Sequence, residues 1–122
     1  MLYTTSVSAF KRIKRKVKVY YIVKDHGNDV VMPDRVDLDH YRSRVLTWEG
    51  FKVNYLAKLM RPEADEWMRR VSEEAVSEDV VLVDEEKDAG HSCRKFLAEM
   101  MVNMFSGRLK LRYAGELTNY GL

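Results

Sequence analysis

The sequence is poor in the residues that mark disulfide-bonded, fibrous and membrane-spanning proteins. Its 122 residues include one cysteine, two prolines and six glycines. The single Cys93 excludes an internal disulfide and a cysteine-rich zinc site, and it favours a reducing compartment. No apolar run reaches the length of about 20 residues that a transmembrane helix needs, and no signal-peptide pattern precedes Lys11. We therefore expect a cytoplasmic protein without a membrane segment.

What is present is typical of one globular domain. Hydrophobic residues make up 46% of the chain and charged residues 33%, a balance that can bury a core without disulfides or a structural metal. We expect residues 1–122 to form a single domain. Residues 114–122 carry little pattern and are expected to be a frayed tail or an extension of a sheet edge.

Charge is distributed in blocks. Residues 1–62 carry a net charge of +7, residues 63–88 carry −8, and residues 89–122 carry +3, for a total of +2. Such blocks can steer a partner toward one surface. The alternative is that the acidic middle pairs with the basic flanks inside the fold or across a dimer.

The first half is dominated by patterns typical of strands. Residues 12–23 alternate with a period of two, which predicts a half-buried strand with Arg15 as the one misfit on its apolar side. Residues 25–29 supply turn chemistry, and residues 30–32 are expected to return as a short second strand that Pro33 ends.

Residues 36–60 admit two interpretations. One is a hairpin over residues 44–55 with a turn at Glu49-Gly50. The other is a long helix that begins near Asp37 or Asp39. Gly50 and the many β-forming residues favour the hairpin slightly, although residues 55–60 suit a helix.

The second half has clearer signals. Pro62 opens a helix whose buried stripe is expected to contain Ala64, Trp67, Met68, Val71 and Ala75. Residues 80–83 form a continuous apolar run, as in a strand covered on both faces. A second helix is expected from about residue 92 to residue 106, with Gly107 as its left-handed terminator, followed by a strand over residues 108–113.

Together these elements predict an α+β domain with a mixed β-sheet, in the order β-β-(β-β)-α-β-α-β, and two main helices packed on one face. Residues 80–113 should form a parallel strand–helix–strand crossover.

The alternation places cations on the outer faces of the first and last predicted strands. If these strands share a sheet, their cations would form one surface for a phosphate backbone, with a tyrosine for stacking. The residues of this nucleic-acid surface are Lys14, Lys16, Lys18, Tyr20, Arg108, Lys110 and Arg112. Lysines on an exposed strand also prevent edge aggregation, which is the competing interpretation.

A second candidate site is the start of the helix at residue 92. Arg94 and Lys95 oppose the helix dipole there, an arrangement that suits an anion held by Ser92, Arg94 and Lys95. The alternative is that an acidic residue of 84–88 folds back and neutralises the two cations.

Other chemistry has weaker signals. The acidic residues 84–88, with His91 and Cys93, could be assembled into a metal site, but an acidic surface loop is the simpler interpretation. His26, His40 and His91 are too scattered for a zinc signature. Cys93 is expected to be a small buried side chain. We therefore predict no catalytic residue, no metal and no cofactor.

We expect a small binding protein rather than an enzyme. The leading hypothesis is contact with nucleic-acid phosphates through the basic strand faces, without base-specific motifs. The alternative is a protein-binding or inhibitor module, including a homodimer, that uses the charge-asymmetric surface.

Overall fold

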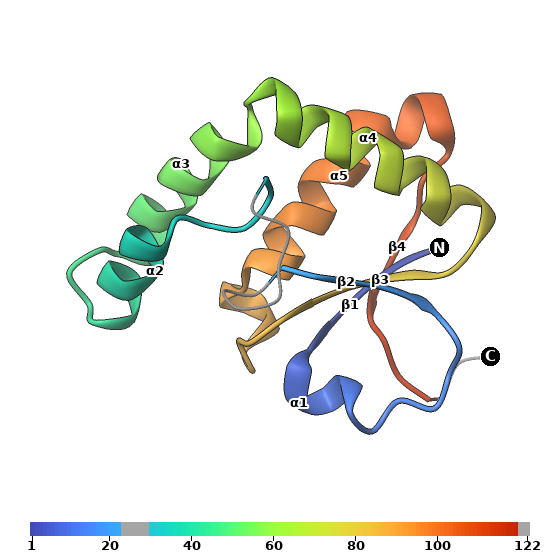
Figure 1. The fold of residues 1–122 in the computed structure, drawn as a ribbon, viewed down its shortest axis with the longest axis horizontal. Coiled ribbons are helices and arrows are strands. Elements are labelled where there is room, and N and C mark those ends of the chain that lie inside the picture. The colour runs from blue at the N-terminus through green and yellow to red at the C-terminus, as the bar shows by residue number, and fades with distance from the viewer. Residues whose placement is uncertain (23–29, 120–122) are drawn as a thin grey trace.

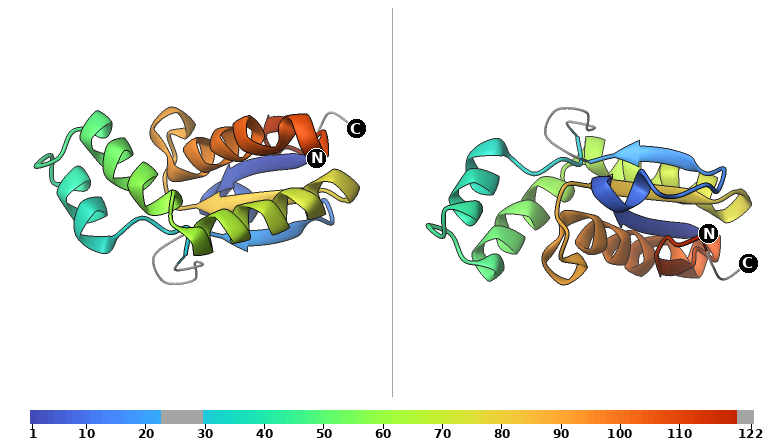
Figure 2. Two further views of the ribbon diagram at one scale, coloured as in Figure 1. Left: turned by 90° about the horizontal axis from the view of Figure 1, so that it is seen from above. Right: turned by 90° about the horizontal axis from the view of Figure 1, so that it is seen from below.

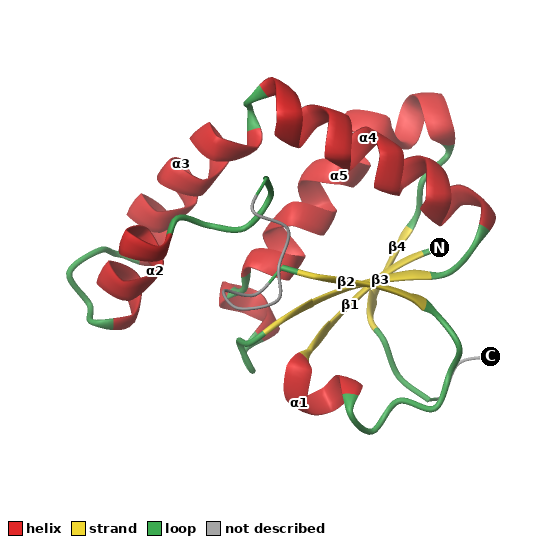
Figure 3. Cartoon of the chain, in the orientation of Figure 1, coloured by secondary structure: helices red, strands yellow, loops and turns green. Residues whose placement is uncertain are grey.

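A computed structural model of the chain describes residues 1–22 and 30–119. The turn expected at residues 25–29 therefore lies outside the described residues. Within them, helices and strands follow one another as Figure 3 shows. The elements are β1 (Leu2–Ser6), α1 (Val7–Phe10), β2 (Lys18–Tyr21), α2 (Arg35–Arg42), α3 (Trp48–Leu59), α4 (Pro62–Ser77), β3 (Val80–Asp84), a 3₁₀ turn (Ala89–His91), α5 (Cys93–Leu109) and β4 (Tyr113–Glu116).

The four strands form one sheet in the order β2-β3-β1-β4. All three pairings between neighbours are parallel. Lys18 pairs with Val80, Val80 with Leu2, and Leu2 with Tyr113, so the four strands begin at the same edge of the sheet. The single small α+β domain is confirmed, and so is the parallel relation of the strands on either side of α5, whereas the expected mixed sheet is corrected to a parallel one.

The central strand β1 was not predicted. Leu2–Ser6 is rich in β-branched and aromatic residues, and four of its five residues are buried. Its short length and its position at the start of the chain left too few alternating positions for a pattern. The sheet is nevertheless built around it, because β3 and β4 pair with its two edges.

Three layers are visible in Figure 1, where helices lie above the sheet and α1 lies below it. The upper face packs against α4 and α5 in a large core that includes Leu2, Val80 and Leu82. The lower face carries a small cluster of Val81, Val83 and Leu117. Seen from below in Figure 2, α1 and the loop after it cover this lower face.

The helices of the second half agree with their patterns. Pro62 occupies the first turn of α4, where its missing N–H costs nothing. All five residues of the expected stripe are buried. Strand β3 is buried at every position, as expected for a strand with both faces covered.

The hairpin expected over residues 44–55 is wrong, because residues 44–47 form the turn between α2 and α3, and residues 48–55 lie in α3. Thr47 caps α3 by accepting a hydrogen bond from the Gly50 N–H at 3.1 Å. A Cβ at Gly50 would lie 2.9 Å from Leu46 Cδ1. The glycine thus makes room for the Leu46 side chain instead of forming a turn.

Three other expected strand segments are corrected. Residues 12–17 form a loop, and only Lys18–Tyr21 is a strand. Residues 30–32 are not a strand; the Val31 carbonyl accepts a hydrogen bond from the buried Tyr55 hydroxyl at 2.5 Å. The last strand is Tyr113–Glu116, because α5 continues through Gly107 to Leu109 and ends at Lys110 with φ of 56°.

No helix in the described part of the chain is long and apolar enough to cross a membrane.

Candidate functional site

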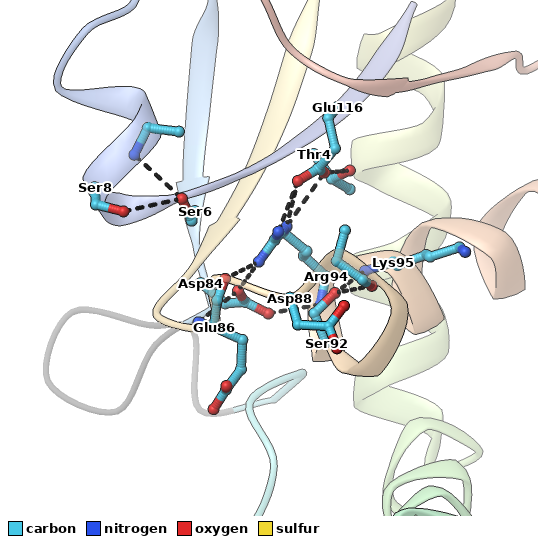
Figure 4. A network of polar contacts seen from close by, with 12 residues as sticks. Thr4, Ser6, Ser8, Asp84, Glu86, Asp88, Ser92, Arg94, Lys95 and Glu116 are labelled. Atoms are coloured by element: carbon cyan, nitrogen blue, oxygen red, sulfur yellow. Dashed lines mark hydrogen bonds and ion pairs between the residues drawn. The ribbon is translucent and has the colours of Figure 1, made fainter.

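The carboxyl edge of the sheet gathers polar side chains from three elements. Strand β1 ends at Ser6, β3 ends at Asp84, and α5 begins at Cys93. Figure 4 shows Asp84, Glu86 and Glu116 around Arg94. Ligands of open parallel sheets bind at this edge, between strands whose connections leave in opposite directions. Strands β1 and β3 are such a pair, because β1 leads to the outer strand β2 and β3 leads to β4 at the other edge.

Arg94 lies at the centre of this edge, and its side chain is only 1% exposed. The Asp84 carboxylate accepts a hydrogen bond from the Arg94 backbone N–H at 2.9 Å and from Arg94 Nη1 at 2.5 Å. On the other side, Arg94 Nη2 donates to Glu116 Oε1 at 2.6 Å. The guanidinium also donates to the Glu86 carbonyl. Arg94 is thus a buried cation held between two carboxylates.

Burial and pairing act against each other in this cluster. Burial raises the pKa of the Asp84 carboxyl, and the hydrogen bonds from Arg94 limit the rise. Burial lowers the pKa of Arg94, but Glu116 and Asp84 raise it more, so the guanidinium stays charged. One buried cation therefore compensates two carboxylates, of which Glu116 remains partly exposed, at 39% of its side chain.

The residues predicted to hold an anion are used internally. The Ser92 hydroxyl accepts from the Lys95 N–H at 3.3 Å and donates to the Ala89 carbonyl at 2.7 Å. Asp84 occupies the N-terminus of α5, which is the place of the expected anion. The alternative interpretation, in which an acidic residue of 84–88 neutralises the cations, is therefore correct for Arg94, which pairs with Asp84. Lys95 is exposed.

Cys93 and the acidic residues do not form a reactive set. Burial raises the pKa of the Cys93 thiol well above its usual range, so the thiolate nucleophile is disfavoured. In the part of the chain that the structure describes, no three His, Cys, Asp or Glu residues are grouped to hold a metal ion. His91 stacks on Trp48, with ring centroids 5.1 Å apart. His26 lies outside the described residues.

The basic residues near the N-terminus lie mainly on the loop that covers the lower face of the sheet. Lys14 and Lys16 are exposed, as the alternation predicted, although they are not on a strand. Arg15, the predicted misfit, points inward, and its Nη2 lies 3.2 Å from Asp79 Oδ2. Ile13 and Val17 pack against the lower cluster.

Lys18 and Tyr20 are placed differently from the prediction. Both face the helix layer, where the Lys18 ammonium pairs with Glu74 and the Tyr20 hydroxyl donates to Glu74 at 2.5 Å. Tyr20 also meets Trp67 edge-on, with ring centroids 5.5 Å apart. Both side chains thus contact Glu74 on the helix side of the sheet, although Lys18 remains partly exposed.

The other predicted cations lie on the far side of the sheet. Arg108 is in the last turn of α5, Lys110 ends that helix, and Arg112 precedes β4. All three are exposed. Strands β2 and β4 are the two outer strands, with β3 and β1 between them. The two basic groups therefore do not form the single strand-face surface that the alternation predicted.

The acidic block pairs with only part of the basic flanks. Its ion pairs in the described residues join Glu74 with Lys18, Asp79 with Arg15 and with the N-terminus, Asp84 with Arg94, and Glu86 with Arg42. Four exposed cations of the loop take part in no ion pair within residues 1–22 and 30–119. They are Lys11, Arg12, Lys14 and Lys16.

Sequence reasoning missed the polar partners from β1 and β4. Thr4 Oγ1 lies 2.6 Å from the Tyr113 hydroxyl and donates to the Glu116 carboxylate. Glu116 also binds Arg94, which is 22 residues earlier in the chain. No spacing rule links these positions; a lone acidic residue in a β-forming tail was the available signal.

Comparison with known proteins identifies one relationship. No curated protein and no solved structure matches the chain. Residues 6–101 match the family described as "Domain of unknown function DUF488". This span contains the basic loop and the Asp84–Arg94 pair, and it leaves out Arg108, Lys110 and Glu116. Because the match covers well over half of the chain, the protein belongs to the DUF488 family.

Proposed function

We propose that this domain binds nucleic-acid phosphates through the basic loop, defined as residues 11–16. The observation that carries the proposal is a group of four exposed cations within these six residues that form no ion pair with the described part of the chain: Lys11, Arg12, Lys14 and Lys16. A cation displaces counterions from nucleic acid when it neutralises a phosphate, and an exposed side chain without an internal carboxylate partner is the most accessible for this.

The basic loop is also held in shape. The Lys14 N–H donates to Asn119 Oδ1 at 2.9 Å, and Asn119 Nδ2 donates to the Arg12 carbonyl at 2.9 Å. Arg15 anchors the middle of the loop on Asp79 and on the Tyr3 ring, 4.9 Å from the ring centroid. A loop that is ordered before binding loses less conformational entropy when a ligand docks.

A second, separate group of cations lies at the edge of the sheet where the strands begin. Arg108, Lys110 and Arg112 are exposed near the start of β4. Lys16 lies just before β2, and β2 and β4 begin at the same edge of the sheet. The two starts are three strand spacings apart, or about 14 Å, a distance that one bound strand of nucleic acid spans in a few nucleotides. Lys18 and Tyr20 are not part of the proposed surface.

The test is fluorescence anisotropy with labelled single- and double-stranded oligonucleotides of about 20 nucleotides, from about 25 mM to about 250 mM salt. We compare wild type with the fourfold variant Lys11→Gln, Arg12→Gln, Lys14→Gln, Lys16→Gln. A matched control removes the same charge elsewhere, through Arg61→Gln, Arg69→Gln, Arg70→Gln and Lys87→Gln, all exposed positions.

Wild type should bind all sequences alike, and its affinity should fall linearly with salt on a log–log plot. The loop variant should bind at least about tenfold more weakly at low salt, and its salt slope should be shallower by up to about four. The control should stay near wild type. Equal losses in the two variants, or no binding by wild type at the lowest salt, would refute the proposal.

A further inference from the structure

We propose that the groove between α3 and α5 binds a second copy of the chain, so that two molecules form a twofold homodimer. The first observation concerns α3, which is apolar on both sides. Phe51, Tyr55 and Leu59 are buried on its inner side. A helix with apolar side chains on two sides normally has both sides covered.

The outer side of α3 carries a stripe of Val53, Leu56 and Met60, with spacings of three and four residues. Their exposed fractions are 66%, 39% and 71%. In Figure 1, α2 and α3 project to one side of the sheet. The stripe is thus a ridge of apolar side chains that the domain itself leaves in water.

A matching stripe runs along α5. Phe96, Met100 and Met104 are four residues apart and therefore lie on one side of the helix, and all three are half-buried or exposed. Phe96 meets Tyr55 of α3 with ring centroids 5.7 Å apart. Two adjoining hollows share Leu56, Met100 and Met104 in their walls, so they form one continuous groove. Methionines suit such a surface because they adapt to the shape of a partner.

The two ends of the groove carry opposite charge. Lys52 and Lys95 line the end next to Gly90 together with Glu99, so this end carries a net positive charge. Asp65 lines the end next to Pro62. A twofold axis that lies across the groove brings the lysine end of one molecule to the aspartate end of its partner, whereas an axis along the groove would bring lysines together. Charge therefore favours the crosswise axis.

The same features favour a second copy over an unrelated helix. The surface has both a groove and a ridge, so two copies can fill each other's groove with α3. Its two ends also carry charge of opposite sign, so each end of the groove complements the other end in an antiparallel partner. A groove built for an acidic or a basic peptide would carry one sign along its length.

The test measures molar mass by sedimentation equilibrium from about 1 µM to about 200 µM, since a dimer grows with concentration. Wild type should move from 14.3 kDa to twice that mass. Leu56→Glu with Met104→Glu should remain monomeric. Val36→Glu with Val76→Glu, which changes exposed apolar residues outside the groove, should dimerise like wild type. Circular dichroism checks that each variant folds.

A charge swap tests the orientation. Lys95→Glu should weaken dimerisation at least about tenfold, because it faces the partner's acidic end. The double variant Lys95→Glu with Asp65→Lys should restore it. A wild type that stays monomeric, a dimer that the groove variants leave intact, or a double variant that fails to recover would each overturn the proposal. Because none of these variants alters the basic loop, the outcome is separate from that of the nucleic-acid proposal.

Discussion

The two faces of the sheet are built from the same strands but are covered by different kinds of structure. The upper face meets the long helices α4 and α5, which bury a large core. The lower face meets α1, the basic loop and Leu117, around a small cluster. Helices satisfy their own backbone hydrogen bonds, and most side chains on the side that faces the sheet are buried against it. In the loop, only alternate side chains pack against the sheet, and the side chains between them face solvent and can be charged.

The polar groups of the two faces differ in the same way. On the upper side, Arg94 is buried between Asp84 and Glu116. On the lower side, Lys14 and Lys16 are exposed without ion pairs in the described residues. The carboxyl edge, where parallel sheets commonly bind ligands, is thus filled by the protein's own ions, while the loop leaves its cations accessible.

The largest expected loss of stability comes from removing the buried cation on the helix-covered face. Arg94→Met should lower the free energy of unfolding by about 3–5 kcal/mol, because Asp84 and Glu116 lose their shared cation. Chemical denaturation followed by circular dichroism measures this loss. A loss under about 1 kcal/mol would show that the ions contribute little there.

The same variant has a predicted pH dependence. Burial already raises the pKa of Asp84 above its ordinary value of 3.8, and without Arg94 it should rise further. The folded variant then binds protons more readily than its unfolded chain. Its deficit relative to wild type should therefore be smallest below the unfolded pKa and grow as pH rises through the folded pKa. A deficit that is constant with pH would contradict this account.

The next effect compares the two faces directly, with adjacent valines that are both fully buried. Val80 faces the helices and Val81 faces the loop. Val80→Ala should cost about 2–3 kcal/mol from two lost methyl groups and the cavity they leave. Val81→Ala should cost about 1 kcal/mol less, because a loop can collapse into the space. Equal losses in thermal or chemical denaturation would mean that the loop is as rigid a cover as the helices.

The smallest effect concerns the clamp on the basic loop. Asn119→Ala removes two exposed hydrogen bonds, to the backbone of Arg12 and Lys14. It should cost about 1 kcal/mol or less in stability, and amide exchange at Lys14 should become faster. Because no charge is lost, any weakening of oligonucleotide binding would come from a less ordered loop. An unchanged exchange rate would show that packing of Ile13 and Val17 alone fixes the loop.

The sequence predicted the elements with strong local signals. Pro62 and the stripe of α4 defined that helix, and the apolar run of residues 80–83 defined a covered strand. Alternation also predicted correctly that Lys14, Lys16 and Arg112 are exposed. Alternation did not distinguish a strand from a loop, because a loop that packs on a sheet also has alternately buried and exposed side chains. Gly107 was wrongly expected to end α5, where its missing Cβ meets open space.

Composition and local pattern determined the class of this protein, its covered strand and its two long helices, because these depend on neighbouring residues. Tertiary structure alone decided which strands are neighbours, that Leu2–Ser6 is central, and that Arg94 is shared by Asp84 and Glu116. It also decided which cations pair with a carboxylate and which form no ion pair within the described residues. Such outcomes depend on contacts between residues far apart in the chain, and the energy of an ion pair depends on burial that no local pattern contains.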